Sequence, residues 1–142
     1  MRITTRGRYA LRASLALARL QNEKSPITIN QLSEEGKISS VFLEQIFFKL
    51  RKAGIVNSVR GPGGGFQFAK TPDKITLLEI LEAAGEELDV TECDKNAKAC
   101  DITVKRCPSH SVWEDVNTIL KDYFSKMTLA KVLERKIPII YR

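Results

Sequence analysis

Apolar side chains recur at every third or fourth position in three long segments of the chain, residues 5–21, 40–52 and 111–127. This spacing places the apolar side chains on one face of a helix. Residues 55–60 alternate and are rich in β-branched side chains, and residues 66–69 form a second short strand candidate. The pattern therefore predicts a mainly α-helical fold with one small β-hairpin.

Capping signals predict further helix boundaries. Thr28, Thr76 and Ser111 each stand three residues before a Gln or Glu, the capping-box pattern in which two side chains satisfy free backbone amides. Each is expected to open a helix. Gly36 is expected to end the first of these helices in the left-handed conformation, and Thr128 is expected to cap a short last helix.

The order of the elements predicts a winged helix-turn-helix. Two helices joined by a tight turn, the second with a polar outer face, are typical of a helix-turn-helix. The candidate hairpin follows directly, and its Gly-rich turn, residues 61–65, contains residues that accept positive φ. We expect this winged domain over residues 1–84, a loop over 85–110, and a long helix with an apolar tail over 111–142.

Charge is distributed unevenly along the chain. The net charge is +6, but residues 1–70 carry 12 Lys and Arg against four acids, a net charge of +8, and the remainder carries 11 basic and 13 acidic residues, a net charge of −2. A basic half suggests a face that binds a polyanion such as DNA. Charge alone is also compatible with an ordinary solvated surface.

The basic half contains side chains suited to DNA. Glu44 and Gln45 lie on the outer face of the second helix of the helix-turn-helix, where Glu can accept from cytosine and Gln can bond adenine; Glu44 is alternatively a solvated surface residue. Arg60, at the base of the wing, suits the minor groove, and the amides of Gly63–Gly65 could approach phosphate. Tyr9 fits a core position and a phosphate contact equally well.

All three cysteines fall within fifteen residues, and His110 follows the last of them at a distance of three positions. Thiolates and imidazole are ligands for iron–sulfur clusters or zinc, and the loop has no periodic face that cysteines would fill as core residues. Gaps of six residues are wider than the close pairs usual at structural zinc sites, which favours a cluster. His110 could alternatively form a local hydrogen bond.

Several classes of protein are disfavoured. No apolar run approaches the roughly 18 residues of a membrane span, and the charged N-terminus lacks the apolar stretch of a secretion signal, so we expect a cytoplasmic protein without a membrane partner. The sequence has one histidine, no paired carboxylates and no nucleotide-binding glycine motif. It therefore lacks the groups that an enzyme would use for catalysis. A single recognition helix reads half an operator, so the helix over 111–127 is expected to form a homodimer.

Residues 1–10, 42–47, 50–56 and 58–66, above all the Arg-Gly-Pro-Gly-Gly-Gly sequence of the wing, resemble the IscR/NsrR type of bacterial winged-helix iron–sulfur regulators. The resemblance covers nearly the whole chain. It implies a homodimeric transcription regulator that binds a double-stranded DNA operator and carries a [2Fe–2S] or related cluster. Such regulators control cluster assembly, iron homeostasis, the nitric-oxide response or cysteine metabolism.

The IscR subtype is indicated by residues 107–110, Cys-Pro-Ser-His. It implies a ligand set of three thiolates and one imidazole, formed by Cys93, Cys100, Cys107 and His110. The DNA-binding residues expected from the patterns and the resemblance together are Arg2, Thr4, Tyr9, Ser40, Val41, Glu44, Gln45, Lys49, Arg60, Gly63, Gly64 and Gly65. Val41 stands where the subtype has serine, which predicts an altered operator. The alternative is a winged-helix regulator that uses its cysteines as a thiol switch or zinc site and is governed by a partner protein.

Overall fold

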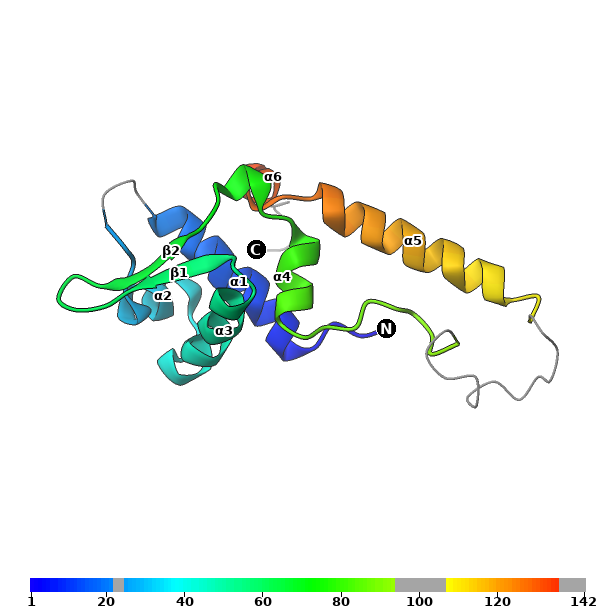
Figure 1. The fold of residues 1–142 in the computed structure, drawn as a ribbon, viewed down its shortest axis with the longest axis horizontal. Coiled ribbons are helices and arrows are strands. Elements are labelled where there is room, and N and C mark those ends of the chain that lie inside the picture. The colour runs from blue at the N-terminus through cyan, green and yellow to red at the C-terminus, as the bar shows by residue number, and fades with distance from the viewer. Residues whose placement is uncertain (22–24, 94–106, 136–142) are drawn as a thin grey trace, which may run out of the picture.

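The computed structural model describes residues 1–21, 25–93 and 107–135. In this part of the chain, six α-helices, one two-stranded sheet and one 3₁₀ turn follow each other (Figure 1). In chain order they are α1 (Thr5–Leu20), α2 (Ile29–Gly36), α3 (Ser40–Lys52), β1 (Val56–Val59), β2 (Gly65–Phe68), η1 (Pro72–Lys74), α4 (Leu77–Ala83), α5 (His110–Lys126) and α6 (Leu129–Glu134). The mainly helical fold with a small antiparallel hairpin is confirmed.

The hydrophobic core surrounds α1. Its inward face carries small side chains, Ala10, Ala13 and Ala16, none of which is exposed. Small side chains at a helix contact let the neighbouring axes approach closely. The inward face of α3 adds four buried side chains to the same core, Leu43, Ile46, Phe47 and Leu50. The apolar stripe predicted for α3 therefore packs on α1 and leaves the other face of α3 at the surface.

The helix-turn-helix is formed by α2 and α3. The predicted capping box at Thr28 is present, with the Gln31 amide donating to Thr28 Oγ1 at 3.2 Å, and Ser39 caps α3 by accepting from the Phe42 amide. The prediction for Gly36 is wrong: the left-handed residue is Lys37, with φ of 52°. Gly36 remains helical and is buried against Ala16 of α1.

The hairpin is a short wing. β1 pairs antiparallel with β2, from Val56 opposite Phe68 to Val59 opposite Gly65, and Phe66 exchanges two backbone hydrogen bonds with Ile27 at 2.8 and 2.9 Å. Gly65 has φ of 154°, and a Cβ there would lie 2.2 Å from the Ile27 carbonyl oxygen. The glycine is therefore needed because the wing is joined closely to the segment before α2.

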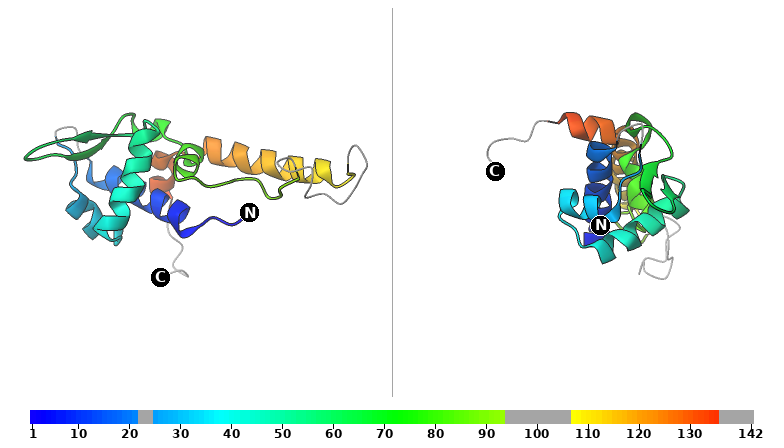
Figure 2. Two further views of the ribbon diagram at one scale, coloured as in Figure 1. Left: turned by 60° about the horizontal axis from the view of Figure 1, so that its bottom comes forward. Right: turned by 90° about the vertical axis from the view of Figure 1, so that its left-hand side faces the viewer.

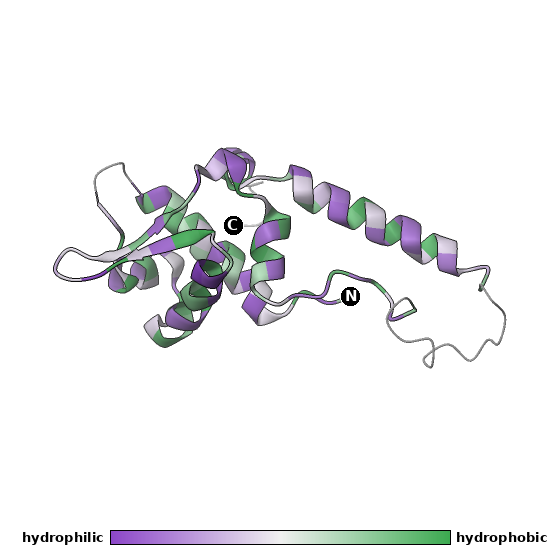
Figure 3. Ribbon diagram, viewed as in Figure 1, coloured by the Kyte–Doolittle hydropathy of each residue, from purple (hydrophilic) through white to green (hydrophobic). Residues whose placement is uncertain are grey.

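α5 extends away from the other helices as an arm (Figure 1, Figure 2). It begins at His110, with Ser109 as its N-cap residue, so the predicted capping box at Ser111 is wrong: Ser111 already lies in the first turn. Its hydroxyl donates to the Pro108 carbonyl at 3.4 Å instead. The colouring by hydropathy shows apolar and polar residues alternating along this helix (Figure 3).

The segment that leads from α4 toward the cysteines packs against α5. The Val90 amide donates to Asn117 Oδ1 at 2.8 Å, and Lys121 pairs with Asp89 at 2.8 Å. Leu88 is buried as well. The first residues of the predicted loop over 85–110 are therefore held by polar partners on α5 that the sequence pattern does not reveal.

α6 returns to the winged domain. The Leu77 amide donates to the Met127 carbonyl, and the Leu129 amide donates to the Ile75 carbonyl. Leu129 is fully buried in the core formed by α1 and its neighbours. The predicted segment 111–142 therefore contributes its last described helix to the domain that precedes it. None of the helices described combines the length and hydropathy needed to cross a bilayer.

Candidate nucleic-acid interface

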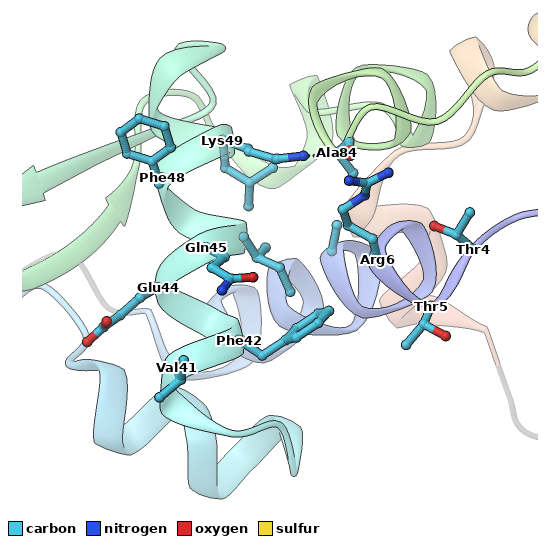
Figure 4. A pocket seen from close by; sticks show the side chains of 13 residues that line it. Thr4, Thr5, Arg6, Val41, Phe42, Glu44, Gln45, Phe48, Lys49 and Ala84 are labelled. Carbon is cyan, nitrogen blue, oxygen red and sulfur yellow. Dashed lines mark hydrogen bonds between the residues drawn. The ribbon is translucent and has the colours of Figure 1, made fainter.

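The outer face of α3 carries the side chains predicted to meet DNA. Val41, Glu44 and Gln45 are exposed. Figure 4 shows Glu44 pointing away from α1 and Gln45 lying on the side of α3 that faces the start of α1. Ser40 is half-buried in the first turn. Since the opposite face of α3 is fixed in the core, the orientation of these side chains is determined by packing.

A groove of about 900 Å³ separates α3 from the beginning of α1. It is lined by Thr5 and Arg6 on one side and by Phe42, Gln45 and Lys49 on the other. The positive charges of Arg6 and Lys49 therefore stand on both walls, beside the base-reading residues of α3. Such a distribution suits a polyanion that lies across the groove.

Several of the predicted contact residues have partners within the protein, Lys49 and Tyr9 among them. Lys49 Nζ donates to the Ala84 carbonyl at 3.4 Å, where the negative end of the α4 dipole attracts a cation. Tyr9 packs edge-on against Phe42, with ring centroids 5.3 Å apart, and the Arg12 guanidinium lies 5.5 Å from the Tyr9 ring. Tyr9 is therefore a half-buried aromatic side chain that packs beside the groove, as the first of the two interpretations expects, and the phosphate contact stays a prediction.

Glu86 is a structural residue that sequence reasoning missed. Its carboxylate accepts from the Gly7 amide at 2.9 Å, from the Thr4 amide at 3.2 Å and from the Thr4 hydroxyl. It thereby caps α1 from 79 positions further along the chain. A local pattern cannot reveal this contact. Gly7 gives the only hint, since a Cβ there would lie 2.6 Å from Glu86 Cγ.

The hydrogen bonds to Glu86 determine its protonation. Burial acts to raise its pKa, but the bonds from Thr4 and Gly7, together with the charge of Arg6, outweigh burial and hold the pKa below its ordinary value. Glu86 is therefore ionised at neutral pH, which suits the positive end of a helix dipole. Thr4, predicted to bind DNA, uses its hydroxyl and amide in this contact.

The wing presents Arg60 and Gly63 to solvent. The Gly64 amide donates to the Gly61 carbonyl at 2.9 Å, so this amide closes the turn and is not directed at a partner. The Arg51 guanidinium, at the end of α3, donates to the Ser58 hydroxyl on β1 at 3.3 Å. This hydrogen bond connects α3, the candidate recognition helix, to the wing. Arg2, at the exposed N-terminus, completes the predicted set.

The cysteine segment is described at its two ends. Cys93 and Cys107 are half-buried free thiols, and Cys100 lies outside the described residues. Cys107 Sγ contacts Ser109 Oγ at 3.0 Å. This contact, with backbone hydrogen bonds from Ser109 and His110, lowers the pKa of the Cys107 thiol. His110 Nε2 lies 3.3 Å from Glu114 Oε1, one turn further along α5.

No three His, Cys, Asp or Glu side chains are grouped as a metal site within residues 1–21, 25–93 and 107–135. The predicted ligand set includes Cys100 and so extends beyond these residues. The four-ligand arrangement implied by the sequence therefore stays a prediction.

A basic winged helix-turn-helix with outward polar side chains on its second helix defines a class, the winged-helix DNA-binding transcription regulators. Comparison with protein families narrows the class. The Rrf2 model, described as an iron-dependent transcriptional regulator, matches residues 3–135. The chain belongs to the Rrf2 family. Relatives in this family are transcriptional regulators and not enzymes, in agreement with the lack of catalytic motifs in the sequence.

Named relatives and solved structures agree with this assignment. IscR, a transcriptional regulator of Vibrio vulnificus, is 38% identical over 133 residues, which is 94% of this chain and 77% of that protein. The structure of T. potens IscR matches with a TM-score of 0.72 and 26% identity, covering 100% of this chain and 97% of the other. CymR, the global cysteine regulator of B. subtilis, shares the fold with a TM-score of 0.78 at 24% identity, covering 96% and 99%.

Proposed function

We propose that this protein is a homodimeric transcription regulator of the bacterial cytoplasm that binds a double-stranded DNA operator and senses iron, cluster supply or redox state through a bound [2Fe–2S] cluster. Its targets are genes of iron–sulfur biogenesis or related processes. The observation that carries the DNA-binding part is the outer face of α3, where Glu44 and Gln45 are exposed beside a basic groove and a wing with Arg60 at its base.

Operator binding is tested on Arg60. Arg60→Ala removes an exposed cation from the wing without disturbing a buried contact, and it should weaken specific binding by about 1–3 kcal/mol if Arg60 enters a groove. Lys74→Ala is the matched control, because it removes the same charge from an exposed position on η1, outside α3, the wing and α5. Gel-shift titrations at several salt concentrations measure both variants. Operator affinity unchanged in Arg60→Ala would contradict the role of the wing.

The residues at the described ends of the cysteine segment fit a thiolate- and imidazole-ligated group. Cys93 and Cys107 are free of disulfide bonds in the described part of the chain, and the Cys107 thiol contacts the Ser109 hydroxyl. Glu114 orients the His110 ring, and carboxylates commonly orient ligating histidines in this way. The residues that would hold the cluster are Cys93, Cys100, Cys107 and His110. When bound, a cluster of this kind supplies a one-electron redox centre and a charge that changes with its state.

This segment lies between the winged domain and α5. Glu86, Asp89 and Val90 connect its first residues to α1 and to α5 through hydrogen bonds and an ion pair. Ligation at the cysteines would therefore act on both the beginning of α1 and the arm that we propose for dimerisation. A change in the spacing of two recognition helices alters how a dimer fits its half-sites.

Anaerobic purification, followed by absorption spectroscopy and iron and sulfide analysis, tests the cluster. We expect a coloured protein that contains iron and sulfide. Replacing any one of the three cysteines by Ala should abolish the colour. His110→Ala should weaken or alter the cluster, and His110→Cys should retain it. An unchanged spectrum and redox potential in His110→Ala would place the fourth ligand elsewhere.

The second candidate function keeps the winged helix but uses the cysteines without iron. It is favoured by Cys107, a half-buried free thiol in contact with a hydroxyl, which is an arrangement suited to a thiol switch or to zinc. A colourless protein that contains zinc, or one with titratable thiols and no metal, would support this alternative. Either result would exclude the cluster but leave the DNA-binding proposal intact.

A further inference from the structure

Val41 is a large apolar side chain that α3 leaves in water. It is 67% exposed, more than any other large hydrophobic residue in the described part of the chain. Phe48, two turns later on the same helix, is also exposed, but the Arg51 guanidinium lies 5.7 Å from its ring. Single exposed apolar residues are common on protein surfaces, so exposure alone does not assign a role to Val41. The position of Val41 on the helix indicates its role.

Val41 lies in the first turn of α3, two residues after the Ser39 cap. Glu44 and Gln45 follow at spacings of three and four, so the three side chains share one face of the helix. The residues that read base edges in a helix-turn-helix lie at this N-terminal end of the recognition helix. The isopropyl group of Val41 therefore stands beside the two side chains with hydrogen-bonding chemistry for bases.

Only one apolar group faces a protein in the major groove of DNA. This is the C5-methyl group of thymine, which side chains contact by apolar packing. We propose that Val41 reads the C5-methyl group of a thymine in the operator half-site. The proposal rests on the DNA-binding part of the proposed function and deepens it. Residues three positions apart are separated by about 4.5 Å along a helix, close to one base-pair step of about 3.4 Å, so the thymine is expected next to the base pair that Glu44 contacts.

Deoxyuridine substitution isolates this contact, because it removes the thymine methyl group and leaves base pairing unchanged. The probe is a double-stranded operator selected from a randomised library by the full-length wild-type protein. Each thymine of a half-site is replaced by deoxyuridine in turn, and affinity is measured for the wild type and for Val41→Ala. Val41→Thr retains one methyl group of similar shape. Val59→Ala is the matched control, because it makes the same truncation on the wing, away from α3.

We expect one thymine at which deoxyuridine weakens wild-type binding by about fourfold, the effect of one buried methyl group. Val41→Ala should bind thymine and deoxyuridine at that position equally well, Val41→Thr should show an intermediate difference, and Val59→Ala should retain the full difference. Thermal unfolding establishes that the exposed substitution leaves the fold intact.

Two results would overturn the inference, and they are distinguishable. A wild-type protein that selects an operator but is insensitive to deoxyuridine at every thymine, or a Val41→Ala variant that keeps the full sensitivity, would exclude the methyl contact alone. A wild-type protein that selects no operator in either the iron-loaded or the metal-free form would exclude the proposed function and the inference with it.

Discussion

Glu86 shows how one residue joins parts of the chain that no local pattern connects. Its carboxylate occupies the amides at the beginning of α1, so the positive end of that helix is already satisfied within the protein. The start of α1 also lines the groove beside α3. Glu86 therefore positions one wall of the candidate DNA interface although it follows α4.

Glu86→Gln should destabilise the protein by about 1 kcal/mol at neutral pH, the usual cost of losing a helix cap. Because the pKa of Glu86 is lowered by folding, the carboxylate contributes stability that is complete above its unfolded pKa and is lost as pH falls through the lower folded value. The difference between wild type and variant should therefore shrink in acid. Denaturant unfolding between neutral and acidic pH measures it.

Glu82→Gln is the matched control for this prediction, since Glu82 is an exposed carboxylate on the neighbouring helix α4. It should leave the stability profile nearly unchanged. If Glu86→Gln is as stable as the wild type at neutral pH, the cap is not a net contributor to stability.

Glu44 should determine sequence preference more than affinity. The side chain is exposed on α3, and a carboxylate there repels phosphates while it accepts a hydrogen bond from cytosine. Glu44→Ala should therefore select a different set of sequences from a randomised operator library without a large loss of affinity. Identical preferences in the two selections would make Glu44 an ordinary surface residue.

At the scale of helices and strands, local sequence signals predicted the elements correctly wherever the hydrogen-bonding groups of residues close in the chain pair with each other. The capping boxes at Thr28 and Thr76 and the Thr128 cap are of this kind, and so is the antiparallel wing. The signals failed at Ser111, because the N-cap of α5 is Ser109, two residues earlier. They could not detect the partners of Lys49 or Glu86, which lie on other elements. Cluster ligation, dimerisation and the DNA contacts themselves stay predictions.

The end of α2 provides a direct test of backbone strain. Lys37 adopts φ of 52°, a left-handed conformation that disfavours residues with a Cβ. Lys37→Gly should raise the free energy of unfolding by about 0.5–1 kcal/mol, since the relief of strain exceeds the entropy that glycine adds to the unfolded chain. The contact of Arg12 with the Lys37 carbonyl involves only the backbone and remains available.

Chemical denaturation measures this change, and Lys52→Gly serves as the control. Lys52 is the last residue of α3 and is helical, so glycine there should destabilise the protein. A Lys37→Gly variant that loses stability would contradict the account of the α2 terminus.

At the scale of the whole molecule, α5 differs from the other helices because much of its apolar surface is uncovered. Val112, Ile119 and Tyr123 are exposed, and together with Val116 they recur at alternating steps of four and three residues, the spacing of a seam between two helices. The opposite side of α5 is occupied by Asn117 and Lys121, which contact residues 89–90. We propose that a second copy, which presents the same seam, packs on the exposed side.

Ile119→Glu should convert the proposed dimer to a monomer. Ile119 is 66% exposed in the single chain, so the charge is tolerated there, but it would be buried without a partner at the centre of a helix pair. Each large side chain that such a pair buries contributes about 1.5–3 kcal/mol, and an unpaired carboxylate at the same place costs more. Thr118→Glu, which adds the same charge on an exposed position outside the seam, should remain dimeric. Sedimentation measures both variants, and a dimeric Ile119→Glu protein or a monomeric wild type at micromolar concentration would show that α5 is not the dimer interface.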